Sequence, residues 1–380
     1  MRNLAARIQV PGGPRTGVYG DLRMTIRVLV VDDSALIRNV LQAIINEQSD
    51  MQVVGLAPDA LVARELVRVL NPDVITLDIE MPKVDGLTFL QQLMEEAPRP
   101  VLMVSSHTET GSDLTFRALE IGAVDFITKP KLNLNDGQNY GDLIADKIRA
   151  AAGARLNVRA GNRVPDASAA TAGPKASVKG SPVDTPDVVV MGASTGGTEA
   201  VRAVLESMPA SCPPILIVQH IPENFTQLFA DRLDGFCKIA VKQAEDGEPI
   251  LPGHAYIAPG HAHLTIRSGG AQRYCVELVQ SDPVNLHRPS IEVLFHSAAK
   301  CAGSGAIGVI LSGMGKDGPA GLLEMKHSGA RTLAQDEQTS VVFGMARDAI
   351  QLGAVDEVLP LDGIGARLLE LSKALAGRAA

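Results

Sequence analysis

Residues 26–34 read IRVLVVDDS, and this stretch decides the fold of the first third of the chain. Ile26–Val31 is almost entirely apolar and β-branched, which is typical of a strand buried on both faces. Two acids and a serine follow directly, and Leu36–Asn46 then repeats apolar residues at helical spacing. A buried strand that ends in acids and passes into a helix predicts a parallel α/β sheet with polar residues at its carboxyl edge.

The same alternation continues through the first 151 residues. Strands are expected over Gln52–Leu56, Val74–Leu77, Val101–Val104 and Asp125–Ile127, and helices over Ala60–Leu70, Gly86–Glu96, Ser112–Ile121 and Asp142–Ala151. Five such units predict a flavodoxin-like domain at residues 24–151, preceded by a disordered extension at residues 1–23. Residues 152–184 are rich in Ala, Gly, Ser, Thr, Pro and Lys, which predicts a flexible linker. Residues 185–377 resume the α/β pattern and predict a doubly wound, mainly parallel second domain.

Composition excludes several classes of protein. The 380 residues carry 35 basic and 43 acidic side chains, a net charge of −8, which argues against a nucleic-acid partner. No apolar run is long enough for a membrane span, so we expect a cytoplasmic protein without membrane insertion. The four cysteines, Cys212, Cys237, Cys275 and Cys301, are widely spaced, and we expect buried free thiols rather than a disulfide framework or a zinc site.

The first candidate site lies at the strand ends of the first domain. Asp32 and Asp33 follow the first strand and Asp78 ends the third, and three converging carboxylates suit Mg²⁺. Asp78 could then act as a nucleophile that forms an acyl phosphate. Ser105 and Lys129, at the next two strand ends, could contact phosphoryl oxygens. Any one acid could equally be a solvated loop residue or a helix cap, but five matching residues at successive strand ends favour a site.

The second candidate site begins with GASTGG at residues 192–197. It joins an apolar strand, Val188–Met191, to a helix over Thr198–Met208, which is the setting of a nucleophile elbow with Ser194 as nucleophile. A glycine-rich turn before a helix can also be a phosphate-binding loop, so the motif alone leaves both readings open.

Two further strand ends supply partners for Ser194. His220 directly follows the run Ile215–Val218 and its Gln219, and Asp317 follows the run Ala306–Leu311. Each could be structural by itself, but together they place Ser, His and Asp at one edge of one sheet, as a hydrolase triad requires. The chain order Ser, His, Asp disfavours a standard α/β-hydrolase.

The first domain resembles the response-regulator receiver domain, through VLVVDDS at 28–34, DIEMPKVDG at 78–86, Ser105 and Lys129 followed by proline. The resemblance implies that Asp78 is the phosphoacceptor and that Asp32 and Asp33 help it to bind Mg²⁺. It also implies that Ser105 is the switch hydroxyl and that Lys129 contacts the phosphoryl group. Phe126 takes the place of the switch aromatic, and it lacks a hydroxyl group.

The second domain resembles the chemotaxis protein-glutamate methylesterases (CheB). The matching stretches are GASTGG at 192–197, QH at 219–220, YIAPG at 256–260, HRPSIEVLF at 287–295 and SGMGKDG at 312–318. The resemblance implies that Ser194 attacks glutamate methyl esters of methyl-accepting chemoreceptors, with His220 as base and Asp317 holding it. Methanol leaves, and deamidation of receptor glutamines would use the same chemistry without a cofactor in this domain. Backbone N–H groups of Thr195 or Met314 are oxyanion candidates.

The resemblance also implies control by phosphorylation. A chemotaxis histidine kinase would be the phosphodonor, and the unphosphorylated receiver would hinder access of the receptor to the catalytic edge. Two other functions are possible for the whole chain. One is a DNA-binding response regulator, which the acidic α/β second half disfavours. The other is a non-catalytic phosphate-binding output module, which would give His220 and Asp317 no role.

Two histidine groups need separate interpretation. His254, His261 and His263 invite a metal interpretation, but the intervening YIAPG is typical of a strand and turn and no acidic ligand has a fitting spacing, so a metal site is disfavoured. The segment HRP at residues 287–289 either borders a substrate groove or is a surface loop, and the sequence leaves both open.

Overall fold

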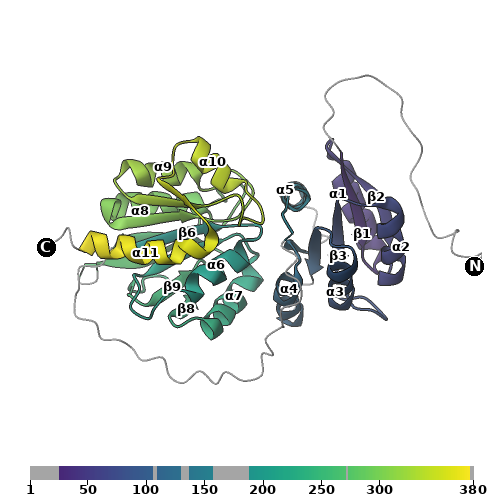
Figure 1. The fold of residues 1–380 in the computed structure, drawn as a ribbon, viewed down its shortest axis with the longest axis horizontal. Helices are drawn as coiled ribbons and strands as arrows, with labels where there is room; N and C mark the ends of the chain where they lie inside the picture. Colours follow the sequence, from purple (N-terminus) through teal and green to yellow (C-terminus); the bar gives the residue numbers. More distant parts are fainter. Residues whose placement is uncertain (1–24, 106–108, 130–136, 157–187, 271–272, 377–380) are drawn as a thin grey trace, which may run out of the picture. The chain divides into compact units, whose positions relative to one another are not determined.

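The computed structural model describes residues 25–105, 109–129, 137–156, 188–270 and 273–376. The chain divides into two compact units, residues 1–159 and residues 160–380, which are described separately (Figure 1). The expected extension at residues 1–23 lies outside the described residues, as does most of the expected linker at residues 152–184. Among the helices that the structure describes, none is both long and apolar enough to cross a lipid bilayer.

The first unit is a five-stranded parallel sheet with helices on both faces. Its strands lie in the order β2–β1–β3–β4–β5. The strands are β1 (Ile26–Val31), β2 (Met51–Ala57), β3 (Val74–Asp78), β4 (Val101–Ser105) and β5 (Asp125–Thr128). The helices are α1 (Ala35–Asn46), α2 (Ala60–Leu70), α3 (Gly86–Glu96), α4 (Glu109–Ile121) and α5 (Gly137–Ala152). β3 and β4 are buried along their whole length, which explains their continuous apolar sequences.

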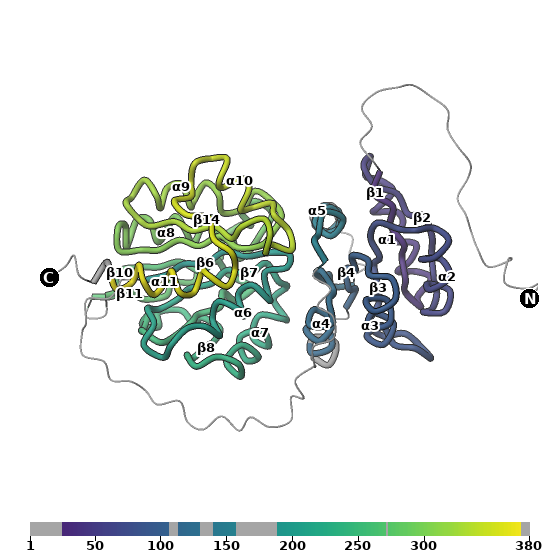
Figure 2. Tube along the Cα trace, in the orientation of Figure 1, coloured from purple at the N-terminus to yellow at the C-terminus, as the bar shows by residue number. Residues whose placement is uncertain are grey.

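The second unit is built on a seven-stranded sheet in which every pair of neighbours is parallel. The order is β14–β13–β12–β6–β7–β9–β8, so the three strands expected to carry the second site are neighbours at its centre. The strands are β6 (Val188–Ala193), β7 (Ile215–Gln219), β8 (Ala240–Gln243), β9 (His254–Ile257), β12 (Ala306–Ile310), β13 (Arg331–Gln335) and β14 (Glu357–Leu359). A separate antiparallel hairpin joins β10 (His263–Ser268) to β11 (Tyr274–Val279), which run side by side in Figure 2.

Helices cover both faces of this sheet (Figure 1). One layer holds α8 (Ile291–Cys301), α9 (Pro319–His327) and α10 (Met345–Gln351), and the other holds α6 (Gly197–Glu206), α7 (Glu223–Phe236) and α11 (Leu361–Ala376). A short 3₁₀ turn, η2 (Gly303–Gly305), connects α8 to β12. Helix α8 also packs on β10, so it ties the hairpin to the central sheet.

The predicted α/β architecture of both halves is confirmed, with small differences at element ends. Helix α4 begins at Glu109 rather than at residue 112, and α5 begins at Gly137 rather than at residue 142. Both added turns are polar and contain glycine, so apolar periodicity could not reveal them. All four cysteines are free, but Cys301 is exposed, so the expectation of burial is wrong for that residue.

Candidate functional sites

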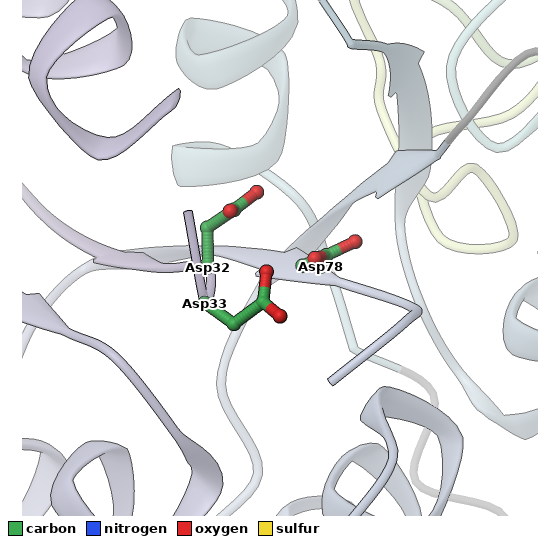
Figure 3. Close-up of side chains that lie close together, drawn as sticks. All are labelled: Asp32, Asp33 and Asp78. Atoms are coloured by element: carbon green, nitrogen blue, oxygen red, sulfur yellow. The ribbon is translucent and has the colours of Figure 1, made fainter. Parts of the chain in front are cut away.

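The three acids of the first site meet at the carboxyl edge of the first sheet (Figure 3). Asp32 and Asp33 follow β1, Asp78 ends the neighbouring strand β3, and one oxygen from each carboxylate lies within 4.8 Å of the others. Asp32 and Asp78 are fully buried, whereas Asp33 is exposed. The neighbouring residue Ser34 takes the helix-capping role, because its Oγ accepts from Ile37 N of α1. The acids are therefore available for a ligand.

Lys129 supplies the positive charge of this site. Its Nζ donates to Asp78 Oδ2 at 2.7 Å and lies 3.4 Å from Asp32 Oδ2. Burial raises the pKa of Asp78 to about 6, with a contribution from repulsion by Asp32, and Lys129 only partly offsets this. Burial likewise raises the pKa of Asp32. The pocket thus holds more negative charge than its single lysine neutralises.

This charge imbalance suits a divalent cation. Oxygen ligands from Asp32, Asp33 and Asp78 are of the hard type that Mg²⁺ prefers. Asp32 Oδ2 is buried and accepts no hydrogen bond within the described part of the chain. The residues present therefore fit the magnesium site that the sequence predicts, and one bound Mg²⁺ would compensate both buried carboxylates.

The two predicted switch residues are buried beside this pocket. Ser105, at the end of β4, accepts a hydrogen bond from Thr115 Oγ1 of α4 at 2.8 Å. Phe126 on β5 is fully buried, with its ring 6.2 Å from that of Phe116 on α4. Lys147 Nζ of α5 lies over the Phe126 ring, 5.9 Å from its centroid. Ser105 thus contacts α4, and Phe126 contacts both α4 and α5.

Ser194 occupies the turn between β6 and α6. Its N–H donates to Ser312 O at 3.0 Å, and its carbonyl accepts from Gly197 N at 2.7 Å and from Gln219 Nε2 at 2.8 Å. Gly196 has a φ of +73°, and a Cβ there would come within 2.4 Å of a valine side chain. The turn is therefore a sharp, fixed elbow at the N-terminus of a helix, which is the geometry of an activated serine.

His220 leaves the neighbouring strand at the same level as Ser194. β6 and β7 pair with Ala193 opposite Gln219, so Ser194 and His220 are the next residues on each strand. His220 Nε2 lies 2.9 Å from Asp317 Oδ2, and because a carboxylate only accepts, Nε2 carries the proton. Nδ1 is buried and has no hydrogen-bond partner among the described residues. The lone pair of Nδ1 is thus the base available to the serine.

The structure places no hydrogen bond between Ser194 Oγ and His220. Such bonds often form only in the substrate complex, so its absence here does not exclude the base. Ser194 and His220 are each 7% exposed, so a substrate group that reaches them leaves most of its water behind.

Asp317 accepts four hydrogen bonds in addition to the one from His220. Its Oδ1 accepts from Ser290 Oγ at 2.7 Å, from Asn285 Nδ2 at 3.2 Å and from Glu292 N at 3.2 Å, and its Oδ2 also accepts from Ile291 N at 2.7 Å. Burial alone would raise its pKa, but hydrogen bonds and charge from His220, with further donors at the start of α8, hold the pKa of Asp317 well below its usual range. The carboxylate therefore stays ionised.

The oxyanion candidates lie next to the nucleophile. A Cβ on Gly313 would come within 2.8 Å of Ser194 Cβ, so the loop after β12 touches the serine directly. Met314 follows in this loop, and its N–H makes no hydrogen bond to any described residue. Thr195 lies on the other side of the serine at the start of the helical turn. Thr195 thus follows the serine directly in the chain, and Met314 follows the glycine that touches it.

Sequence reasoning missed several residues around the triad. The ring of His287, in the segment whose role the sequence left open, stacks on His220 with a centroid distance of 3.7 Å and an interplanar angle of 10°. Asn285 and Ser290 gave no sequence signal of contact with Asp317. His254, His261 and His263 form no metal-binding group within the described residues, where only the three acids of the first site do.

The chain matches known families, curated proteins and solved structures. Residues 189–368 match the CheB methylesterase family model, and residues 28–136 match the response regulator receiver domain. The chain is 57% identical to a protein-glutamate methylesterase/protein-glutamine glutaminase of Nitrosomonas europaea, over 90% of this chain and 96% of that protein. It is 56% identical to a protein of the same name from Thiobacillus denitrificans, over 94% and 99%. A solved CheB methylesterase catalytic domain from Thermotoga maritima is 41% identical over 49% of this chain and 99% of that one, with a TM-score of 0.47.

Proposed function

Because the chain belongs to the protein-glutamate methylesterase/protein-glutamine glutaminase family, with a receiver domain in front of the catalytic domain, we propose that Ser194, His220 and Asp317 perform its hydrolysis. The enzyme is a response regulator that demethylates glutamate methyl esters of chemoreceptors and serves adaptation in chemotaxis. The observation that supports the triad is the bond of 2.9 Å between His220 and Asp317 at a strand end that adjoins Ser194.

The first half of the reaction forms an acyl enzyme. Ser194 Oγ attacks the ester carbonyl carbon while its proton passes to His220 Nδ1, and Asp317 stabilises the resulting imidazolium through Nε2–H. The oxyanion of the tetrahedral intermediate accepts hydrogen bonds from N–H groups near Thr195 and Met314. The C–O bond to the methoxy group then breaks, and Nδ1–H returns the proton so that methanol leaves.

The second half restores the serine. Water gives a proton to His220 Nδ1 and attacks the carbonyl carbon of the glutamyl ester. The bond from that carbon to Ser194 Oγ then breaks, Nδ1–H returns the proton to Oγ, and a free glutamate side chain is released. With a glutamine substrate the same steps apply, except that the departing group is ammonia. One base, one nucleophile and one oxyanion site therefore serve both activities.

The receiver domain would control this reaction through Asp78. We propose that Asp32, Asp33 and Asp78 hold Mg²⁺, which neutralises phosphoryl oxygens when bound. Asp78 Oδ would become the phosphorylated atom, Lys129 would contact the added phosphoryl group, and Ser105 with Phe126 would transmit its arrival to α4. The phosphodonor would be a cytoplasmic chemotaxis histidine kinase, and phosphorylation would relieve hindrance of the catalytic edge by the receiver.

Methanol release tests the assignment directly. Full-length enzyme should release methanol from membranes that contain methylated receptor, faster with Mg²⁺ and a small-molecule phosphodonor. Ser194→Ala should abolish both methanol release and labelling by a serine-directed phosphonate, whereas Asp78→Asn should abolish only the stimulation. Absence of methanol release by the wild-type enzyme under all conditions would overturn the assignment. A non-catalytic phosphate-binding module is disfavoured because it leaves the His220–Asp317 bond without a purpose.

A further inference from the structure

An exposed loop, residues 282–290, brings two side chains to the triad. Asn285 donates to Asp317 Oδ1, and the ring of His287 stacks on the ring of His220. Most residues from Asp282 to Arg288 are exposed, so the loop has little buried apolar surface to hold it in place. A loop of this kind is mobile unless hydrogen bonds fix it. The precision of the triad therefore depends on what anchors this loop.

One buried histidine bonds both ends of the loop. His263, the first residue of β10, is fully buried. Its Nε2 lies 3.1 Å from Asp282 O, where the loop begins, and its Nδ1 lies 3.1 Å from Ser290 N, where the loop ends. Ser290 is also the residue whose Oγ bonds Asp317 at 2.7 Å and caps α8 through Val293 N. The buried His263 ring thus joins both ends of the loop, next to an exposed bond of 3.0 Å from Arg288 Nη1 to Ser281 O.

The two bonds determine the protonation of His263. The backbone N–H of Ser290 can only donate, so Nδ1 must present its lone pair. The carbonyl of Asp282 can only accept, so Nε2 carries the proton. A metal ion would need one of these two nitrogens, and both are already used. The bonding therefore fixes a neutral tautomer and a single ring orientation, as a structural anchor requires.

We propose that His263 is a positioning residue of the esterase, which clamps residues 282–290 so that Asn285, His287 and Ser290 hold Asp317 and His220 in their reactive geometry. His263 touches neither substrate nor the reacting atoms. Its effect on the reaction passes through the loop and the carboxylate of Asp317. The proposal rests on the proposed function of the triad, and it adds a residue that acts from the hairpin rather than from the central sheet.

Three substitutions separate the two bonds in the full-length enzyme. His263→Asn keeps an acceptor at the Nδ1 position for Ser290, His263→Gln keeps a donor near the Nε2 position for Asp282, and His263→Phe keeps the ring volume without either bond. We expect kcat for methanol release to fall by about tenfold to a hundredfold in His263→Phe, with KM changed by less than about twofold. The two amide variants should lie between His263→Phe and the wild type.

A spectroscopic measurement reports the geometry independently of turnover. The Nε2–H proton of His220, shared with Asp317, should give a downfield proton resonance in the wild type, assigned by its loss in Asp317→Ala. We expect this resonance to shift or broaden in His263→Phe. His254→Phe is the matched control. Among the described residues, His254 bonds a local carbonyl, Pro252 O at 2.9 Å, and stacks on Tyr256, so its replacement should keep both kcat and the resonance.

Two results would overturn the proposal. One is an unchanged kcat per folded molecule in all three variants, with folded protein counted by calorimetry. The other is a fall in kcat in His263→Phe that leaves the His220 resonance unaltered in that variant. If the wild type releases no methanol, the proposed function fails, but the resonance still decides whether His263 positions the His220–Asp317 pair.

Discussion

Replacing Asp317 by Asn tests the electrostatic role of the triad carboxylate. Asp317 accepts from three donors at Oδ1 and from two at Oδ2. The NH₂ group of the new asparagine must therefore face donors whichever oxygen it replaces. Its NH₂ should take the Oδ1 side, where the hydroxyl of Ser290 and the amide of Asn285 can turn round and accept. The new carbonyl oxygen then faces Ile291 N and His220 Nε2, so His220 keeps its tautomer but loses its negative partner.

The size of the effect follows from the lost charge. A full charge pair about 4 Å apart contributes about 4 kcal/mol at an effective dielectric constant of about 20. The retained neutral hydrogen bond is worth about 1 kcal/mol. The imidazolium is therefore less stable by about 3 kcal/mol, which corresponds to a fall in kcat of roughly 10²- to 10³-fold. A wrong tautomer would cost more, about 10⁴-fold.

The assay is methanol release at saturating methylated receptor, with folded protein counted by calorimetry. Because the pKa of Asp317 lies well below its ordinary value, the wild-type carboxylate is ionised at any pH of the assay, so partial protonation does not blur the comparison. Asp356→Asn is the control, since Asp356 accepts from Thr332 N at 3.0 Å away from the triad, and it should reduce stability without reducing kcat. A loss of less than tenfold in folded Asp317→Asn would refute the reasoning.

Three further predictions concern stability. Burial raises the pKa of Asp78 from 3.8 to about 6, so its neutral form is favoured on folding; this stabilisation is complete below pH 3.8 and is lost as the pH rises through 6. Without Mg²⁺ and above pH 6, urea titrations should therefore give Asp78→Asn a free energy of unfolding up to about 3 kcal/mol above that of the wild type. Near pH 4 the two proteins should have the same stability. Mg²⁺ should raise the Tm for unfolding of the receiver domain in the wild type, and the rise should be smaller in Asp33→Asn. Calorimetry over a series of magnesium concentrations measures both shifts, and equal shifts in the two proteins would exclude Asp33 as a ligand. Leu286 has a φ of +69° in an exposed turn, a conformation that glycine adopts without strain. Leu286→Gly should therefore raise the free energy of unfolding of the catalytic domain by up to about 1 kcal/mol in urea titrations, whereas the control Leu286→Ala keeps the strain. A decrease with glycine would contradict a left-handed turn.

Residues that follow strands could be predicted from the sequence, because a parallel sheet brings all its carboxyl ends to one edge. Ser194, His220 and Asp317 each follow an apolar run, and the order β12–β6–β7 makes those runs neighbours. The acids of the receiver are predictable for the same reason. Pairing geometry thus converts a one-dimensional pattern into a site without any knowledge of side-chain contacts.

The contacts that fix the site could not be predicted in this way. His263 and Ser290 are joined across 27 residues by a backbone N–H, and Asn285 reaches Asp317 across 32 residues. These partners lie in loops and in a hairpin outside the central sheet, where neither helical nor strand periodicity applies. The atom of His220 that faces Asp317 is likewise a matter of side-chain torsion, which no residue spacing reveals.

Helix α8 has a consequence for labelling the enzyme. It begins beside Asp317 and runs for 11 residues to Cys301, so its two ends lie about 16 Å apart on opposite edges of the sheet. Cys301 is exposed, whereas Cys212, Cys237 and Cys275 are buried. The Cys301 thiol donates to Ile266 O at 3.1 Å and burial raises its pKa, so a thiol-reactive fluorophore should attach at this one position only when the pH is raised enough to ionise it. Such a dye would sit far enough from Ser194 to leave turnover intact, and it would offer a fixed reference point for following receptor docking by energy transfer.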